Sequence, residues 1–158
     1  MKRYIKTSIS EDEVVDQCKA MYSELWKLHS DAASLGHDWN SSGKDVTPDM
    51  INLAQAMLDV VGAKGTITTL PPNNPRKRNL KNPWDYYRMN IQFTIGDVSE
   101  QAIIYSHSNY FHWEDFINRL LKVYYRAKTG KRSDTLLSRI DSYRYRDSFP
   151  NVDRFSIV

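Results

Sequence analysis

The fold is decided by a stretch near the middle of the chain, YRMNIQFTI at positions 87–95. Apolar and polar side chains alternate along it at every step, which is the period of a β-strand with one buried side and one solvent-facing side. Gly96 and Asp97 then supply a turn signal, and QAIIYSH at 101–107 has the composition of a returning strand. Residues 86–107 therefore predict a β-hairpin.

Two amphipathic helices precede the hairpin. Ser10 and Glu13 have the spacing of a capping box, and an apolar stripe at steps of three and four residues follows them, which predicts a helix over 11–35. Pro48 stands at the first position of a second predicted helix, 48–61, which Gly62 ends. The stripe of the first helix consists of Val14, Cys18, Met21, Leu25, Leu28, Ala32 and Leu35.

The remaining elements complete an α-α-β-β-β-α-α order. A short β-branched strand is predicted at 66–70, a third helix at about 113–128, and a weaker fourth helix after its cap, Ser133. Residues 147–158 alternate weakly and could add an edge strand. The predicted fold class is therefore α+β: two N-terminal helices, a small antiparallel sheet of three or four strands covered by helices, and C-terminal helices.

Composition is consistent with one ordinary globular domain over residues 1–158. Hydrophobic residues make up 41% and charged residues 26% of the chain, so a packed core can form. Residues 71–83, rich in proline, asparagine and basic residues, predict an exposed loop. The one cysteine, Cys18, lies on the apolar stripe and is expected in the core. The absence of disulfide pairs, an apolar leader or a long apolar run predicts a cytoplasmic protein without membrane contact.

No motif indicates catalysis, a metal or a cofactor. His107 and His112 lie close to Glu114 and Asp115, but a five-residue spacing across a turn fixes no ligand geometry, so we interpret them as turn and helix N-terminal residues. His29 lies beside the stripe of the first helix and is expected at its boundary or on the surface. Glycine-rich phosphate-binding loops are absent. We therefore expect a protein that is not an enzyme and has no cofactor.

The charge of the chain is unevenly distributed. Residues 7–75 contain ten acidic and four basic residues, for a net charge of −6; residues 76–88 have a net charge of +4, and residues 119–146 of +7. Basic and aromatic residues interleave in the last two segments, which is typical of surfaces that contact phosphates and bases. The face of the third helix that carries three of the cations is nearly single-signed. The predicted partner-binding residues are Arg76, Lys77, Arg78, Lys81, Trp84, Tyr86, Arg88, Arg119, Lys122, Arg126, Lys128, Lys131, Arg132, Arg144 and Arg146.

One loop resembles a pattern found in other small proteins. Asp38-Trp39-Asn40, Gly43 and Val46-Thr47-Pro48 stand before a predicted helix and strand pair. This arrangement is similar to a W-[DN]-x-x-G loop in small uncharacterised bacterial and phage proteins. The resemblance covers less than half of the chain and implies an accessory or mobile-element protein, without an activity.

Two functions fit these features. The first is a small binding protein that acts by protein–protein contact, as an inhibitor or modulator of a nucleic-acid-handling complex, encoded by a phage or a mobile element. The alternative is direct binding of DNA or RNA through the basic and aromatic surfaces 76–88 and 119–146. Coulomb attraction alone does not separate an acidic protein from a nucleic acid. A homodimer through the stripe of the helix at 11–35 is a further possibility.

Overall fold

The computed structural model describes residues 10–34, 46, 48–70, 88–105 and 110–141. The element order is the predicted one, and the α+β class is confirmed. The elements are α1 (Glu11–Ser34), α2 (Pro48–Val60), β1 (Lys64–Leu70), β2 (Arg88–Ile95), β3 (Val98–Tyr105), α3 (Tyr110–Thr129) and α4 (Leu136–Asp141).

The three strands form one antiparallel sheet in the order β1-β2-β3. Ile95 pairs with Val98 across the two-residue turn, where Gly96 has a φ of +61°, a backbone conformation that glycine adopts without strain. Ile67 of β1 lies opposite Ile91 of β2, so the apolar residues of neighbouring strands share one face. The alternation that predicted β2 thus produces a sheet with one apolar face and one polar face.

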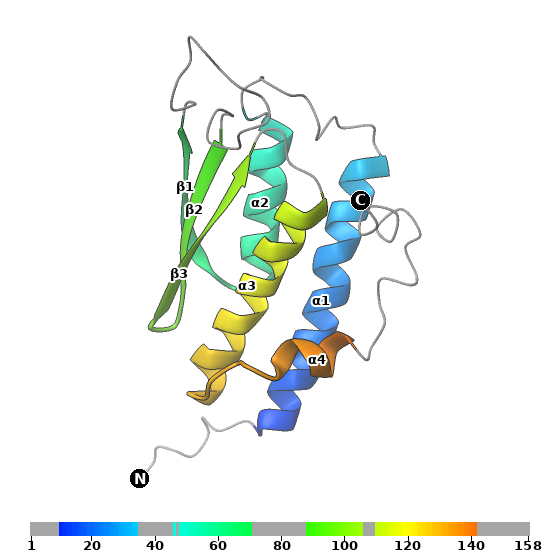
Figure 1. Cartoon of the computed structure of the whole chain (residues 1–158), viewed down its shortest axis with the longest axis vertical. Coiled ribbons are helices and arrows are strands. Elements are labelled where there is room, and N and C mark those ends of the chain that lie inside the picture. The colour runs from blue at the N-terminus through cyan, green and yellow to red at the C-terminus, as the bar shows by residue number, and fades with distance from the viewer. Residues whose placement is uncertain (1–9, 35–45, 47, 71–87, 106–109, 142–158) are drawn as a thin grey trace.

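The described helices cover the apolar face of the sheet. α2 packs against β1, and α3 packs against β3 and β2. α1 lies on the side of these two helices that faces away from the sheet, and α4 crosses the lower end of α1 (Figure 1). The described elements therefore form three layers: sheet, two helices, and one further helix.

The buried side of α1 is rotated relative to the predicted stripe. Val14, Cys18 and Leu25 are fully buried as expected, whereas Met21 and Leu28 are only partly buried. The most buried positions also include Tyr22, Trp26 and His29, because their rings fill the space between α1 and its neighbours. The predicted capping box is confirmed: the Ser10 hydroxyl accepts from the Glu13 amide at 3.1 Å, and Glu13 accepts from the Ser10 amide at 3.0 Å.

Element boundaries differ from the predictions by two or three residues. β1 begins at Lys64 rather than at Thr66, β3 begins at Val98 rather than at 101, and α3 begins at Tyr110. β1 starts earlier because Lys64 and Gly65 also pair with β2, opposite Thr94 and Phe93. The predicted loop 71–83 and the strand in 147–158 lie outside the described residues. No helix in the described part of the chain is both long and apolar enough to span a membrane.

Candidate functional site

Arg119, one of the basic residues predicted on α3, is paired with acidic residues. Arg119 donates from Nε to an oxygen of Asp115 at 2.8 Å, and its Nη1 lies 3.7 Å from an oxygen of Glu100. The hydrogen bond to Asp115 is the main reason why the pKa of Arg119 is raised. The same guanidinium also donates to the backbone carbonyl of Gln101 at 3.4 Å. Arg119 thus binds the helix to the edge of the sheet.

The Glu11 carboxylate binds three side chains from the C-terminal part of the chain. It accepts from Lys131 Nζ at 2.7 Å, from the Tyr125 hydroxyl at 2.6 Å and from Arg139 at 3.1 Å. These hydrogen bonds, chiefly that from Lys131, lower the pKa of Glu11 from 4.5 to about 2. Arg139 also reaches Asp12 at 3.3 Å. The first turn of α1 therefore neutralises basic residues from the C-terminal part of the chain.

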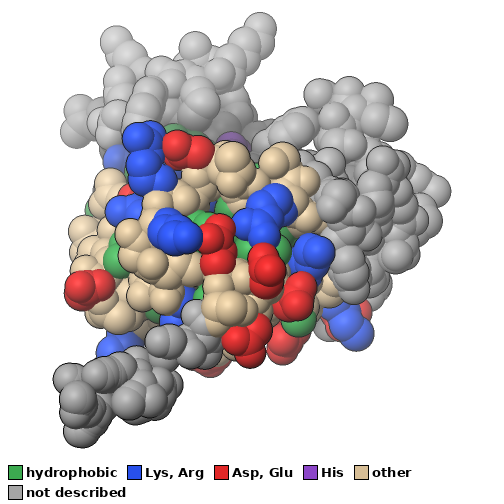
Figure 2. Space-filling view, turned by 90° about the horizontal axis from the view of Figure 1, so that it is seen from below, with side chains coloured by type: hydrophobic (Ala, Val, Ile, Leu, Met, Phe, Trp, Pro, Cys, Tyr) green, Lys and Arg blue, Asp and Glu red, His purple; other side chains and the backbone are tan. Residues whose placement is uncertain are grey.

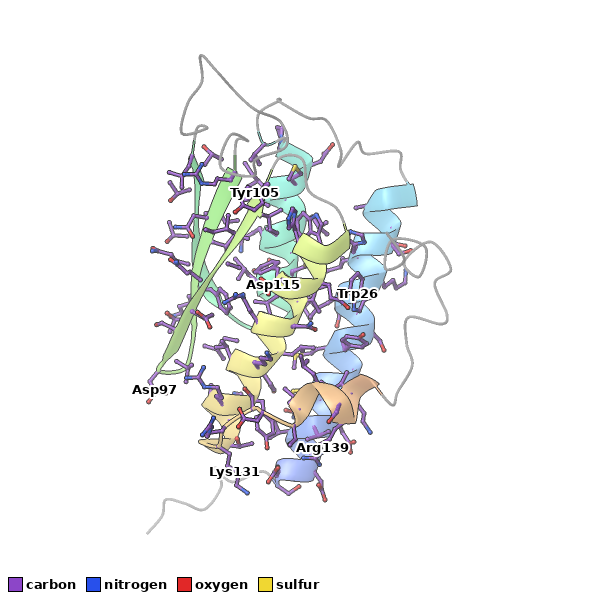
Figure 3. The ribbon with its side chains drawn as sticks, viewed as in Figure 1. Trp26, Asp97, Tyr105, Asp115, Lys131 and Arg139 are labelled. Atoms are coloured by element: carbon purple, nitrogen blue, oxygen red, sulfur yellow. The ribbon has the colours of Figure 1, made fainter. Side chains whose placement is uncertain are left out.

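The lower end of the molecule consequently shows mixed charge. Figure 2 shows Lys and Arg side chains interspersed with Asp and Glu side chains over this end, and Figure 3 shows Lys131 and Arg139 near the start of α1. Arg132 is also paired, with Asp134 at 3.1 Å. The expectation of a nearly single-signed basic surface is therefore wrong for Arg119, Lys131 and Arg132, whose acidic partners come from α1, β3, α3 and the segment before α4.

Three of the predicted cations make no ion pair within the described residues. Lys122 is partly exposed and Arg126 is exposed. Lys128 places its Nζ 5.5 Å from the centre of the Tyr124 ring, within range of a cation–π interaction. Arg88 lies at the start of β2, on the sheet. The remaining predicted contact residues, Arg76, Lys77, Arg78, Lys81, Trp84, Tyr86, Arg144 and Arg146, lie outside the described residues.

No described helix covers the polar face of the sheet. Its side chains form four cross-strand rows, one of them made of Thr66, Gln92 and Gln101. In the next row, the hydroxyls of Thr94 and Ser99 lie 2.8 Å apart. Among the described residues of this face, Lys64 and Arg88 are charged, and Leu70, Ile103 and Tyr105 are apolar or aromatic. A shallow groove runs across it, lined by Lys64, Thr66, Gln92, Thr94, Ser99 and Gln101 among others.

His29 is a core residue rather than a surface residue, which corrects the expectation from the sequence. Its side chain is 2% exposed, and its ring lies 5.5 Å from that of Trp26 and 6.0 Å from that of Trp113. Burial lowers the pKa of His29 from 6.5 to about 4, so the ring is neutral at pH 7. It therefore acts as part of the aromatic packing between α1 and α3. The sequence pattern did not predict the burial of His29, because the predicted apolar stripe of α1 was centred one position away from Tyr22, Trp26 and His29.

Of the residues considered for catalysis or metal binding, those in the described part of the chain are His29, His112, Glu114, Asp115 and Cys18. His112 lies in the first turn of α3 with its ring 5.1 Å from that of Tyr105, and His107 lies outside the described residues. Cys18 is fully buried, and burial raises the pKa of its thiol to about 12. Among the residues that the structure describes, no group of three or more His, Cys, Asp or Glu side chains is placed to hold a metal ion.

No known family model, curated protein or solved structure matches this chain.

From the sequence, the polar face of the sheet was predicted only as the solvent-facing side of β2. Asn90, Gln92 and Thr94 occupy the alternate positions of β2, which is the pattern of any half-buried strand. What makes them a candidate site is that β1 and β3 extend the same polar face on both sides of β2. That pairing comes from tertiary structure and has no local signal in the sequence.

Proposed function

We propose that this protein is a binding module that acts by protein–protein contact, and that a partner protein docks on the polar face of the sheet. The proposal rests mainly on one contrast. Arg119, Lys131 and Arg139 are engaged by acids of the same chain, whereas the sheet face that no described helix covers presents mainly uncharged side chains. A protein surface can pair with such groups at a polar interface.

A polyanion would require a different surface. Affinity for DNA or RNA depends on cations that neutralise phosphates, and the sheet face supplies only Lys64 and Arg88. The main cations left for the nucleic-acid alternative, within the described part, are Lys122 and Arg126 of α3. The expectation that the partner belongs to a nucleic-acid-handling complex remains a prediction.

A pair of matched variants tests the docking face. Gln92→Arg changes the middle of the sheet face, and Asn52→Arg makes the same change to an exposed amide side chain on α2. Tagged wild-type protein and both variants are used to capture partners from the native host, with and without nuclease. The captured partner is then purified and its affinity is measured for each form as a function of salt concentration.

We expect that a protein partner is still captured after nuclease treatment and that its affinity changes little with salt concentration. Gln92→Arg should weaken binding by about tenfold or more, because a bulky charge in the centre of a contact must be desolvated. Asn52→Arg should leave the affinity unchanged. Capture that requires nucleic acid, or an affinity that falls steeply and log-linearly with salt, would support the nucleic-acid alternative instead.

A further inference from the structure

Among the described strands, β1 forms one edge of the sheet. It pairs with β2 alone among the described strands, and no described residue forms a hydrogen bond with its other side. Its sequence, KGTITTL, contains no proline, and its only charge is at the first position. The register with β2 runs without a bulge from Lys64 to Leu70. Proteins normally protect exposed edges with charges, prolines, bulges or a covering element, so this edge is ready to pair.

The hairpin determines which backbone groups of β1 point outward. Residues that flank a two-residue turn exchange hydrogen bonds, so Ile95 and every second residue before it bond to β3. The intervening residues of β2, such as Gln92, therefore bond to β1. Since Thr66 pairs with Gln92, the even-numbered residues of β1 point their amides and carbonyls at β2. The outward groups belong to Gly65, Ile67 and Thr69.

We propose that β1 pairs antiparallel with β1 of a second copy of this chain, about a two-fold axis through Ile67. In this register each outward residue meets an outward residue: Ile67 meets itself, and Gly65 meets Thr69 of the other copy. The backbone amides and carbonyls of all three outward residues of each strand then form hydrogen bonds, about six in total between the two chains. The two sheets become one continuous sheet, and the interface is isologous, as in most homodimers.

The side chains of β1 are compatible with this pairing. On the polar face, Thr66 lies opposite Thr68 of the second copy, and Thr–Thr cross-strand pairs are favourable. Lys64 lies opposite Leu70 of the second copy, so no like charges face each other. On the helix side, the partly buried Ile67 packs against the same residue of the other copy at the axis, which removes apolar surface from water.

This interface differs from the homodimer expected from the sequence. The stripe of α1 is buried in the chain's own core, with Val14, Cys18 and Leu25 fully covered, so its apolar surface is already used. Pairing through β1 instead joins the polar faces of two copies side by side. The inference goes beyond the proposed function and does not depend on it, because Thr69 pairs with Met89 on the helix side of the sheet, so Thr69→Pro leaves the side chains of the proposed docking face unchanged. A seven-residue edge is a small interface, so we expect a reversible dimer.

Two kinds of variant test the pairing by sedimentation of the full chain over a range of about 1 µM to 1 mM. Wild-type protein should rise from its chain mass of 18.5 kDa to twice that mass. Thr69→Pro removes an outward amide without touching the β1–β2 ladder, and should weaken the dimer by about ten- to a hundredfold, because one hydrogen bond is lost on each side of the axis. Far-UV circular dichroism and thermal unfolding establish that the variant is folded.

A charge pair tests the register. Thr66→Lys together with Thr68→Lys places like charges opposite each other twice and should weaken the dimer by about tenfold. Thr66→Glu together with Thr68→Lys places opposite charges there and should restore or strengthen it. Wild-type protein that keeps its single-chain mass at every concentration overturns the proposal. A dimer that none of these variants changes overturns it too, because the contact would lie elsewhere.

Discussion

The two edges of the sheet have opposite surroundings. At β3, α3 lies alongside the strand, and Arg119 donates to the outward carbonyl of Gln101 while pairing with Glu100 and Asp115. At β1, no described side chain reaches the outer backbone groups. Both strands belong to the same three-stranded sheet and have similar lengths. The difference therefore comes from the helix next to each edge rather than from the strands themselves.

The helices differ in length and in how they approach the strands. α3 has 20 residues and packs Phe116 against Phe93 of β2, with ring centres 6.2 Å apart. α2 has 13 residues and approaches β1 closely at Gly65, where an added Cβ would lie 2.8 Å from Leu58 Cδ1. A long arginine spans the gap between α3 and its strand. From α2, the Leu58 side chain lies close to Gly65, and no described α2 side chain covers the outer backbone groups of β1.

The largest expected effect is on the β3 side of the core. Phe116→Ala removes a fully buried ring between α3 and the sheet, and should lower the free energy of unfolding by about 3–5 kcal/mol. Ile67→Ala, at the partly buried centre of β1, should lower it by only about 1 kcal/mol. Chemical denaturation of both variants, at a concentration where the chain is monomeric, measures the difference. Equal losses would contradict the asymmetry between the two sides.

The free energy of unfolding should depend on pH through His29, which is packed between α1 and α3. The pKa of His29 falls from 6.5 to about 4 on folding, so the unfolded chain binds the proton more readily between these values. The stability associated with neutral His29 is complete above about pH 6.5 and is lost as pH falls toward 4. Between pH 7 and pH 5 the expected loss is about 2 kcal/mol.

His29→Phe is the test of this pH dependence. It keeps a ring between Trp26 and Trp113 but removes the titrating group. The free energy of unfolding of the variant should change by about 2 kcal/mol less than that of the wild type between pH 7 and pH 5. This interval lies above the range in which Glu11, with its pKa lowered to about 2, loses its charge. Parallel pH profiles for the two proteins would contradict a buried, neutral His29.

The close approach of α2 to β1 predicts a smaller effect. In Gly65→Ala the new Cβ would lie 2.8 Å from Leu58 Cδ1 and 3.1 Å from the Gln92 carbonyl oxygen. Leu58 is fully buried, so it cannot move away freely, and we expect a net loss of about 1–2 kcal/mol in thermal or chemical unfolding. Adding Leu58→Val should recover part of the loss caused by Gly65→Ala. A Gly65→Ala variant as stable as the wild type would show that the two elements are not in close contact.

The smallest effect is expected at the covered edge itself. Arg119→Met removes a partly exposed ion pair and the bond to the Gln101 carbonyl, and should cost about 0.5–1 kcal/mol. Lys27→Met breaks another i,i+4 pair, Lys27–Asp31 at 2.9 Å, which lies on α1 away from the sheet. It should cost less, because both of its partners are well exposed. Chemical denaturation compares the two, and a larger loss for Lys27→Met would count against the edge-capping role.

Local patterns predicted the fold well but misplaced the buried side of α1. Alternation in β2 and the capping box at Ser10 depend on neighbouring residues, and both features were confirmed. The stripe of α1 was misplaced because Tyr22 and Trp26 were not counted among its apolar positions. A large ring at the margin of a stripe is buried when a neighbouring helix offers space, and the sequence of one helix does not contain that information.

The sequence by itself determined the order of the elements, the two-residue turn and the polar side of the central strand. These features follow from backbone preferences and side-chain periodicity over a few residues. Only the tertiary structure decided that the basic C-terminal half is partly neutralised, since Lys131 meets Glu11 from 120 residues away along the chain. It also decided which sheet edge is covered, because that depends on where α2 and α3 pack against the sheet. Contacts of this kind depend on the distance between atoms in the folded chain, which composition and local spacing do not specify.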